Sequence, residues 1–187
     1  MAKYELVLND KKEFLGRTLY RVRALVAIGS LVAPGQLGGY IEKEANLDHS
    51  GNAEVCGNAM VCDDALVYGN AKVSGDALVY GNAWVYGNAR VYGNAKVYGD
   101  AKVCGNAKVC DDAEIKSSKD YIVFKNTWSS FRWFTYTKSN KMWKVGCFYG
   151  TGKELIKKAY ADSENSGKHY EAYVNLVTEL EKIESGD

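Results

Sequence analysis

Apolar residues recur every six positions through the middle of the chain. From Gly51 to Lys116 the sequence consists of eleven consecutive hexads, Gly/Asp-Asn/Asp-Ala-x-Val/Ile-x, without insertion or deletion. The third position is always Ala, and the fifth is Val in ten hexads and Ile115 in the last. One variable residue separates these positions, so each hexad is predicted to hold a short strand with Ala and Val facing inward. The Gly-Asn or Gly-Asp pair supplies a turn, and the small inward side chains predict a narrow solenoid.

The number of hexads per coil follows from charge. At the second position, Asp replaces Asn at Asp64, Asp76, Asp100 and Asp112. Two hexads per coil would stack Asp64 on Asp76 and Asp100 on Asp112, and like charges in register are unfavourable. Three hexads per coil avoid every such pair, so the sequence favours a triangular coil of 18 residues. One face then carries an uninterrupted asparagine column suited to an amide ladder: Asn52, Asn70, Asn88 and Asn106.

The two ends of the chain depart from this period. Residues 1–50 are expected to form an N-terminal β cap with strands at Tyr4–Leu8 and Leu19–Ala27. An inward His49 would lack a partner, so we expect the regular coil to begin at Gly51. Residues 117–187 predict a small β-β-β-α-α module, with strands at Tyr121–Lys125, Arg132–Tyr136 and Met142–Phe148. Thr151 and Glu154 form a capping box for a short helix, and a second helix is predicted from about Lys168 to Ile183.

The hexads resemble the left-handed β-helix of hexapeptide-repeat proteins, a superfamily that includes many acyltransferases. More narrowly, the GNAxVx units preceded by LYRVRALVAIGSLVAPGQLGGYIEKEANL resemble phage and prophage proteins of unknown function. The similarity extends to about Lys116, and the C-terminal segment resembles tails on such proteins. The superfamily's usual glycine directly follows the aliphatic residue, whereas one residue, often Tyr, intervenes here. The resemblance implies a mainly β protein: a left-handed parallel β-helix with an N-terminal β cap and a small C-terminal α+β module.

Composition excludes some classes of function. Lys and Arg number 24 against 23 Asp and Glu, so no global charge points to nucleic acid or a membrane. No apolar run reaches the roughly 20 residues that span a bilayer, and the N-terminus lacks a secretion leader. Four of the five cysteines share one outward slot with none 18 residues from another, which indicates reduced thiols. We therefore expect a cytoplasmic protein, in the host cytosol if it is phage-encoded, that contacts no membrane.

Outward positions of the hexads predict two surface features. The first is an apolar patch on two adjacent faces, which the N-terminal segment or another protomer is expected to cover; it contains Met60, Leu66, Leu78 and Trp84. Members of the hexapeptide-repeat superfamily, which the hexads resemble, commonly form trimers. The resemblance therefore favours a homotrimer, with this patch as its candidate interface. The second is a basic band around the tube, a candidate site for an anionic, nucleotide-like ligand or simply a solvated surface; it contains Arg90, Lys96, Lys102 and Lys108.

Aromatic and cationic residues alternate in the stretch FKNTWSSFRWFTYTKSNKMWK. Aromatic side chains with cations can stack bases or nucleotides, or they can form a protein-binding face. A three-stranded sheet must also bury one face, so about half of these aromatics are expected in a core. The candidate ligand- or partner-binding residues in this module are Trp128, Arg132, Trp133, Tyr136, Trp143 and Lys144.

Catalytic chemistry finds little support. The YGTGKE segment fails as a phosphate loop, because Cys147 stands where a glycine is needed and Glu154 where Ser or Thr would ligate magnesium. The repeats contain no histidine for acyl transfer; His49 precedes them and His169 lies near the last helix. We therefore expect no catalytic residues, metal or cofactor. The resulting hypothesis is a phage-type binding scaffold, a candidate anti-defence protein, that sequesters a nucleotide-like ligand or occludes a host protein. The alternative is a hexapeptide-repeat acyltransferase.

Overall fold

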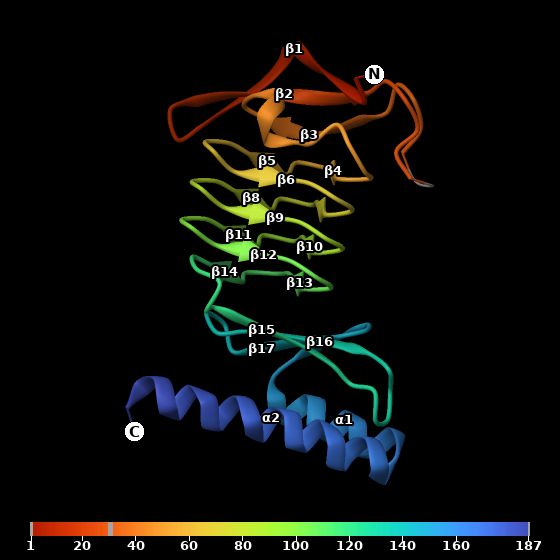
Figure 1. Ribbon diagram of the computed structural model, residues 1–187, viewed down its shortest axis with the longest axis vertical. Helices are drawn as coiled ribbons and strands as arrows, with labels where there is room; N and C mark the ends of the chain where they lie inside the picture. Colours follow the sequence, from red (N-terminus) through yellow and green to blue (C-terminus); the bar gives the residue numbers. More distant parts are fainter. Residues whose placement is uncertain (1, 30–31, 187) are drawn as a thin grey trace. The chain divides into compact units, whose positions relative to one another are not determined.

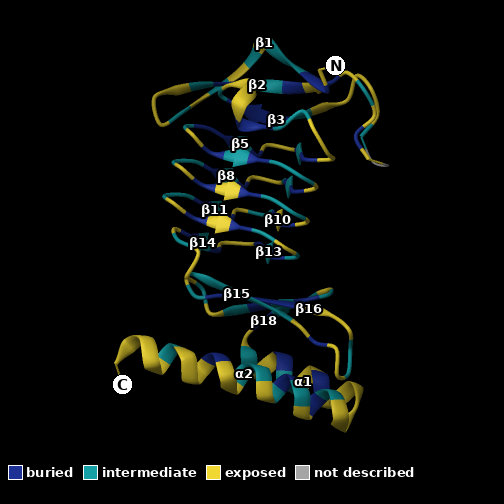
Figure 2. Ribbon diagram, viewed as in Figure 1, coloured by how far each residue is buried: buried dark blue, intermediate teal, exposed yellow. Residues whose placement is uncertain are grey.

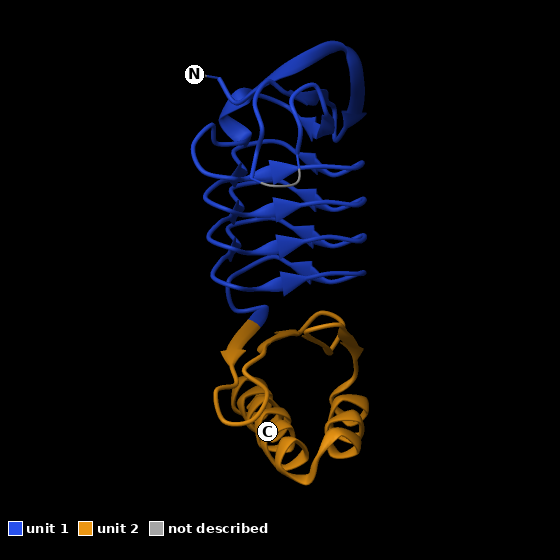
Figure 3. Cartoon of the chain, turned by 90° about the vertical axis from the view of Figure 1, so that its right-hand side faces the viewer, with its two compact units in different colours: residues 1–121 blue, residues 122–187 orange. Residues whose placement is uncertain are grey.

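The computed structural model describes residues 2–29 and 32–186. It divides the chain into two compact units, residues 1–121 and 122–187 (Figure 3). The first unit is the solenoid with its N-terminal cap, and the second is the α+β module. Among the described residues, no helix combines the length and the apolar character that a membrane crossing requires.

The hexads fold into stacked parallel coils (Figure 1). Each forms one short strand from its fourth and fifth residues, and every pairing joins residues 18 positions apart, such as Arg90 with Lys72 and Lys108. The predicted 18-residue coil is therefore confirmed. The strands are β4 (Glu54–Val55), β5 (Met60–Val61), β6 (Leu66–Val67), β7 (Lys72–Val73), β8 (Leu78–Val79), β9 (Trp84–Val85), β10 (Arg90–Val91), β11 (Lys96–Val97), β12 (Lys102–Val103), β13 (Lys108–Val109) and β14 (Glu114–Ile115).

These strands form three sheets, one on each face of the prism. The first contains β4, β7, β10 and β13; the second contains β5, β8, β11 and β14; the third contains β6, β9 and β12. The inward Ala and Val side chains are almost completely buried along the whole tube (Figure 2). At the corners Gly adopts positive φ, as at Gly87, where an added Cβ would lie 3.1 Å from the Gly105 amide nitrogen in the next coil. Small residues thus serve both the interior and the corners.

Second-position side chains bond from coil to coil. The amides of Asn52 and Asn70 each donate to the asparagine one coil further, Asn70 and Asn88, at 3.2 Å. Three other asparagines donate to the carboxylates of Asp76, Asp100 and Asp112, the Asn82–Asp100 bond measuring 3.0 Å. The aspartates therefore accept from asparagine and do not stack on one another. Tyrosines at the sixth position also stack from coil to coil, with ring centroids 4.9 Å apart for Tyr68 and Tyr86.

The N-terminal cap is a hairpin that extends one solenoid face. β1 (Tyr4–Phe14) and β2 (Arg17–Ala24) pair antiparallel, and β2 pairs with β3 (Leu37–Ile41). β1 is longer than predicted, because Lys11, Lys12, Glu13 and Phe14 also pair with the start of β2. A short 3-10 helix, η1 (Glu44–Asn46), follows β3.

Parallel pairing begins before the predicted start at Gly51. Tyr40 in β3 pairs with Met60, and Leu47 bridges to Val67. His49, just before Gly51, is half-buried and has partners: its Nδ1 accepts a hydrogen bond from the Lys3 amide at 3.1 Å, and its ring stacks on Tyr4 at 4.3 Å. The N-terminal segment supplies these contacts, and no hexad pattern reveals them.

The second unit is a four-stranded antiparallel sheet with two helices. Its strands lie in the order β15 (Tyr121–Lys125), β16 (Trp133–Thr137), β17 (Met142–Val145) and β18 (Phe148–Gly150). The predicted third strand is in fact a hairpin, because Gly146 takes a positive φ and separates β17 from β18. The helices are α1 (Gly152–Asp162), with the predicted Thr151–Glu154 capping box, and α2 (Glu164–Ser185). α2 starts earlier than predicted, because the Ser163 side chain caps it.

Candidate recognition surfaces

The basic band is distributed over all three faces of the prism. Arg90 and Lys108 share one sheet, whereas Lys96 and Lys102 each occupy another. Lys96 forms an ion pair with Glu114 at 2.8 Å, and the Lys102 ammonium lies 4.6 Å from the centre of the Trp84 ring. These two cations already have partners within the solenoid. The band is therefore not one continuous cationic patch.

Arg90 borders a polar depression on its own face. Lys72, one coil before Arg90, forms an ion pair with Glu54 at 2.5 Å. Next to this column lies a depression of 220 Å³, lined by these side chains, Asn52, Asn70 and the Ile28–Gly29 segment. Arg90 itself has no ion pair among the described residues. Arg90 thus lies where an anion in this depression could reach it.

The predicted apolar patch is partly covered by the chain itself. Met60 packs against a buried cluster of Leu19, Tyr40 and Cys62, together with Phe14 of the hairpin. Trp84 keeps 38% of its surface exposed, although Tyr68 meets it edge-on and Lys102 covers its face. The N-terminal hairpin thus contacts the Met60 side of the patch, and Met60, Leu66 and Leu78 are all half-buried.

The structure separates the aromatics of the module into core and surface. Tyr136 and Trp143, both candidate ligand contacts, are core residues with 3% and 2% of their surface exposed. They pack with Phe134 on the sheet face that meets the helices. Strand alternation turns both side chains toward Leu155 and Val177, away from the exposed face of the sheet. Both also line a cavity on this side, and their role as ligand contacts stays a prediction. Lys144 and Trp133 lie on the opposite face of the sheet, Lys144 half-buried and Trp133 37% exposed.

Two large aromatic side chains project from the turn between β15 and β16. Trp128 is 74% exposed and Phe131 is 68% exposed. We call residues 126–133 the aromatic turn. Lys125 flanks it, with its ammonium 5.3 Å from the centre of the Trp133 ring and 2.5 Å from the Phe131 carbonyl oxygen. Arg132 is exposed beside them. The surface therefore combines apolar rings with two cations.

Buried Asn126 fixes this turn. Its Oδ1 accepts hydrogen bonds from the Trp128 and Ser129 amides at 3.0 and 3.1 Å. Its Nδ2 donates to the Ser129 and Ser130 hydroxyls, and its backbone amide donates to the Arg132 carbonyl oxygen. An asparagine that bonds its own following backbone is a recognised way to hold a tight turn. The exposed rings thus stand on a hydrogen-bonded frame.

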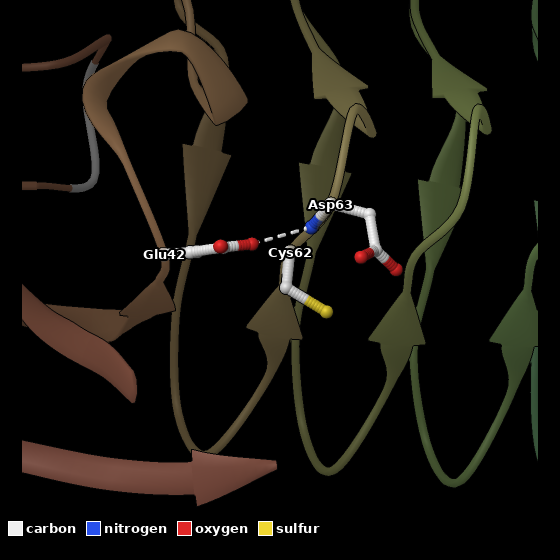
Figure 4. Close-up of side chains that lie close together, drawn as sticks. All are labelled: Glu42, Cys62 and Asp63. Atoms are coloured by element: carbon white, nitrogen blue, oxygen red, sulfur yellow. Dashed lines mark hydrogen bonds between the residues drawn. The ribbon is translucent and has the colours of Figure 1, made fainter. Parts of the chain in front are cut away.

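Glu42, Cys62 and Asp63 lie close together in a cluster that no sequence motif predicted (Figure 4). The Asp63 amide donates to Glu42 at 2.7 Å, and the Gly81 amide donates to the Asp63 carboxylate at 3.0 Å. Arg17 forms ion pairs with both carboxylates. Burial raises the pKa of the Cys62 thiol to about 12. With a protonated thiol and an arginine already between the carboxylates, this donor set does not suit a cation and instead ties β2 to the first coils.

One signal for this cluster was present in the sequence. Asp63 and Asp111 replace the glycine that begins the other nine hexads, and both adopt positive φ. An L-residue in that conformation has a cost, so its retention points to a specific contact. At Asp63 that contact is with Arg17 and the Gly81 amide.

Both histidines make contacts with the chain. His49 is half-buried between Lys3 and Tyr4. His169 is half-buried on α2, with its Nδ1 2.7 Å from the Asn165 carbonyl oxygen. Neither contact involves a hydroxyl or thiol nucleophile.

Comparison with known families agrees with the geometry of the coils. Residues 71–87 and 83–99 match a family profile described as the YdcK Beta solenoid repeat. These matches lie within the hexads. No curated protein matches the chain. The chain is thus a β-solenoid repeat protein by both its coils and this similarity.

Proposed function

We propose that this protein is a non-enzymatic recognition scaffold whose aromatic turn binds a partner protein. The observation that supports this proposal is the exposure of Trp128 and Phe131 on a turn held by buried Asn126. Exposed Trp residues are frequent energetic centres of protein interfaces. A turn fixed before binding also loses less conformational freedom on association.

The chemistry beside the turn suggests the nature of the partner. Lys125 and Arg132 place two positive charges next to the exposed rings. A complementary surface would carry an apolar pocket for Trp128 with carboxylates at its rim. The resemblance to phage and prophage proteins further supports a host protein as the target, whose occlusion would counter a host defence in the cytosol. From the same resemblance we also propose that the coil is left-handed and that the chain is a member of the hexapeptide-repeat superfamily.

A paired-variant capture experiment tests this function. The full chain carrying Trp128→Ala and Phe131→Ala is compared with wild type for proteins retained from host lysate. The matched control is Leu8→Ala, because Leu8 is also strongly exposed, at 70%, but lies in β1. We expect the turn variant to lose a protein that wild type and the control both retain. Equal retention by all three chains would refute the aromatic turn as the recognition surface.

Sequestration of a nucleotide-like anion is the second candidate, supported by Arg90 and its 220 Å³ depression. A melting-temperature rise with nucleotides that Arg90→Gln abolishes would favour it over partner binding. Acetyl-CoA turnover that His49→Ala abolishes would instead favour the acyltransferase and contradict the non-enzymatic proposal.

We also propose that the chain forms a homotrimer through the uncovered part of the apolar patch. Leu66 and Leu78 are half-buried and Trp84 is exposed. Unlike Met60, none of the three belongs to the cluster that packs against the N-terminal hairpin. Sedimentation of wild type and Leu78→Ser tests this assembly. A trimeric mass that Leu78→Ser lowers is the expected result, and a monomeric wild-type mass would exclude it.

A further inference from the structure

The α+β module contains a cavity of its own on the helix side of the sheet. Its volume is 370 Å³, which lies within the range of small-molecule sites. Trp143 of β17 and Val174 and Val177 of α2 supply an apolar lining, and the first turn of α1 closes one end. The cavity is separate from the aromatic turn, whose residues do not line it.

The indole N–H of Trp143 is an unused hydrogen-bond donor at this cavity. The Trp143 side chain is 98% buried, since only 2% of its surface is exposed. Its Nε1 has no hydrogen-bond partner among the described residues. Among the described residues, every fully buried side-chain nitrogen or oxygen has a hydrogen-bond partner. The indole nitrogen therefore retains contact with the cavity, where an acceptor atom could reach it.

The N-terminus of α1 adds further donors beside the indole. Thr151 caps the helix by accepting from the Glu154 amide, and the Glu154 carboxylate accepts from the Thr151 amide at 2.8 Å. The amides of Gly152 and Lys153 have no such partner among the described residues. A Cβ at Gly152 would lie 3.3 Å from Trp143 Nε1 and 2.7 Å from Val174. Glycine thus brings the helix N-terminus, which favours anions, close to the indole N–H.

The charges around the cavity favour an anion. Lys141 and Lys153 both line it and are exposed. The single acidic residue in the lining is Glu181, which accepts a hydrogen bond from the Tyr136 hydroxyl at 2.6 Å. The cavity thus combines two cations, an occupied carboxylate, free donors and an apolar wall.

We propose that this cavity binds a small organic carboxylate with an apolar body. One carboxylate oxygen accepts from the Trp143 indole N–H and the other from the amides at the start of α1, with Lys141 and Lys153 as counter-charges. The apolar body packs on Val174 and Val177. A free small molecule and the C-terminus of a peptide present the same chemistry. This inference does not depend on the proposed function of the aromatic turn.

Titration of the full chain followed by NMR tests the proposal. The four tryptophans give four indole N–H resonances, and Trp143→Phe identifies that of Trp143. Phenylacetate is expected to shift this resonance and the Gly152 and Lys153 amides, whereas the neutral analogue benzyl alcohol is expected to bind at least fivefold more weakly, roughly the strength of a charged contact. N-acetyl-Gly-Leu with a free C-terminus tests the peptide source. The tighter of the two acids identifies the source of the carboxylate.

Charge variants provide the control. Lys153→Gln is expected to weaken phenylacetate binding about threefold. Lys157→Gln, in the same helix but outside the cavity lining, is expected to leave it unchanged. Absence of a Trp143 shift with both acids would overturn the proposal. Equal binding of phenylacetate and benzyl alcohol, or equal weakening by both lysine variants, would do the same.

Discussion

The solenoid and the α+β module treat their outward side chains differently. Along the solenoid, outward groups bond to the next coil, as in the asparagine ladder, the Lys96–Glu114 pair and Lys102 over Trp84. In the module, Trp128 and Phe131 project into solvent although a buried asparagine fixes their turn. Outward side chains of the solenoid that bond to the next coil are not available to bind a partner. We therefore propose that the first unit supplies rigidity and the second unit binds the partner.

The two cores differ as well. The solenoid interior consists of Ala and Val except for Ile115 in the last hexad, so inward side chains away from the two ends have identical neighbours in the coils above and below. The module core consists of large aromatics such as Phe134 and Trp143, with ring centroids 6.4 Å apart. We expect a substitution in the solenoid interior to disturb the packing of the adjacent coils. In the module, single aromatic rings can shift to accommodate such a change.

The largest effect should come from overfilling the prism. Ala95→Leu adds three carbon atoms between Ala77 and Ala113, all fully buried. We expect a loss of about 3 kcal/mol in the free energy of unfolding, measured by denaturant titration. The matching variant in the module is Ala159→Leu, which we expect to cost less. The reverse order would remove the distinction between the two cores.

Removing the frame of the aromatic turn should have the next largest effect. Asn126→Ala leaves the Trp128 and Ser129 amides without their acceptor. We expect a destabilisation of about 2 kcal/mol and weaker partner capture, although both exposed rings remain. Thermal unfolding and the capture assay measure the two effects. Undiminished capture would show that a fixed turn is not required.

Alkaline pH should weaken the cap-to-solenoid contact at Cys62. Burial raises the pKa of this thiol from 9.0 to about 12, so the folded chain keeps a proton that the unfolded chain releases. Its contribution is complete below pH 9 and is lost as the pH rises from 9 to 12. Between pH 8 and 10, wild type should lose about 1 kcal/mol more than Cys62→Ala.

Exposed Cys147 supplies the control for this pH effect, because Cys147→Ala should retain the full wild-type slope. Unfolding at a series of pH values checks both variants. A wild-type slope indistinguishable from that of Cys62→Ala would show that the buried thiol does not contribute.

The smallest effect concerns the basic band. Lys102→Gln removes the cation over Trp84 and should destabilise the chain by about 0.5 kcal/mol. In a Trp84→Leu background the same substitution should have no effect, which a double-mutant cycle measures. An equal loss in both backgrounds would mean that Lys102 acts without Trp84.

The sequence predicted the solenoid well because each structural position is sampled eleven times. Repetition made the 18-residue coil and the amide ladder predictable. It said nothing of contacts made once, such as Arg17 with Asp63 or Lys3 with His49. Those contacts depend on how the N-terminal hairpin folds back, which no period encodes.

In the module the pattern could not separate core from surface. The strand WFTYT of β16 has no charged residue to mark its solvent face, so alternation gave no direction for Trp133, Phe134 or Tyr136. The break at Gly146 was also missed, because one glycine within an apolar run does not distinguish a hairpin from a continuous strand. The sequence named Trp128, Arg132 and Trp143 as candidates, whereas the cavity that Trp143 lines required coordinates.

Oxidative footprinting of the chain bound to its captured partner tests most directly whether the module, and not the solenoid, contacts that partner. Trp128 and Trp84 are both exposed aromatics, one in the module and one in the solenoid. Our account predicts that the partner protects Trp128 from oxidation and leaves Trp84 at its unbound rate. Protection of Trp84 with no change at Trp128 would contradict it.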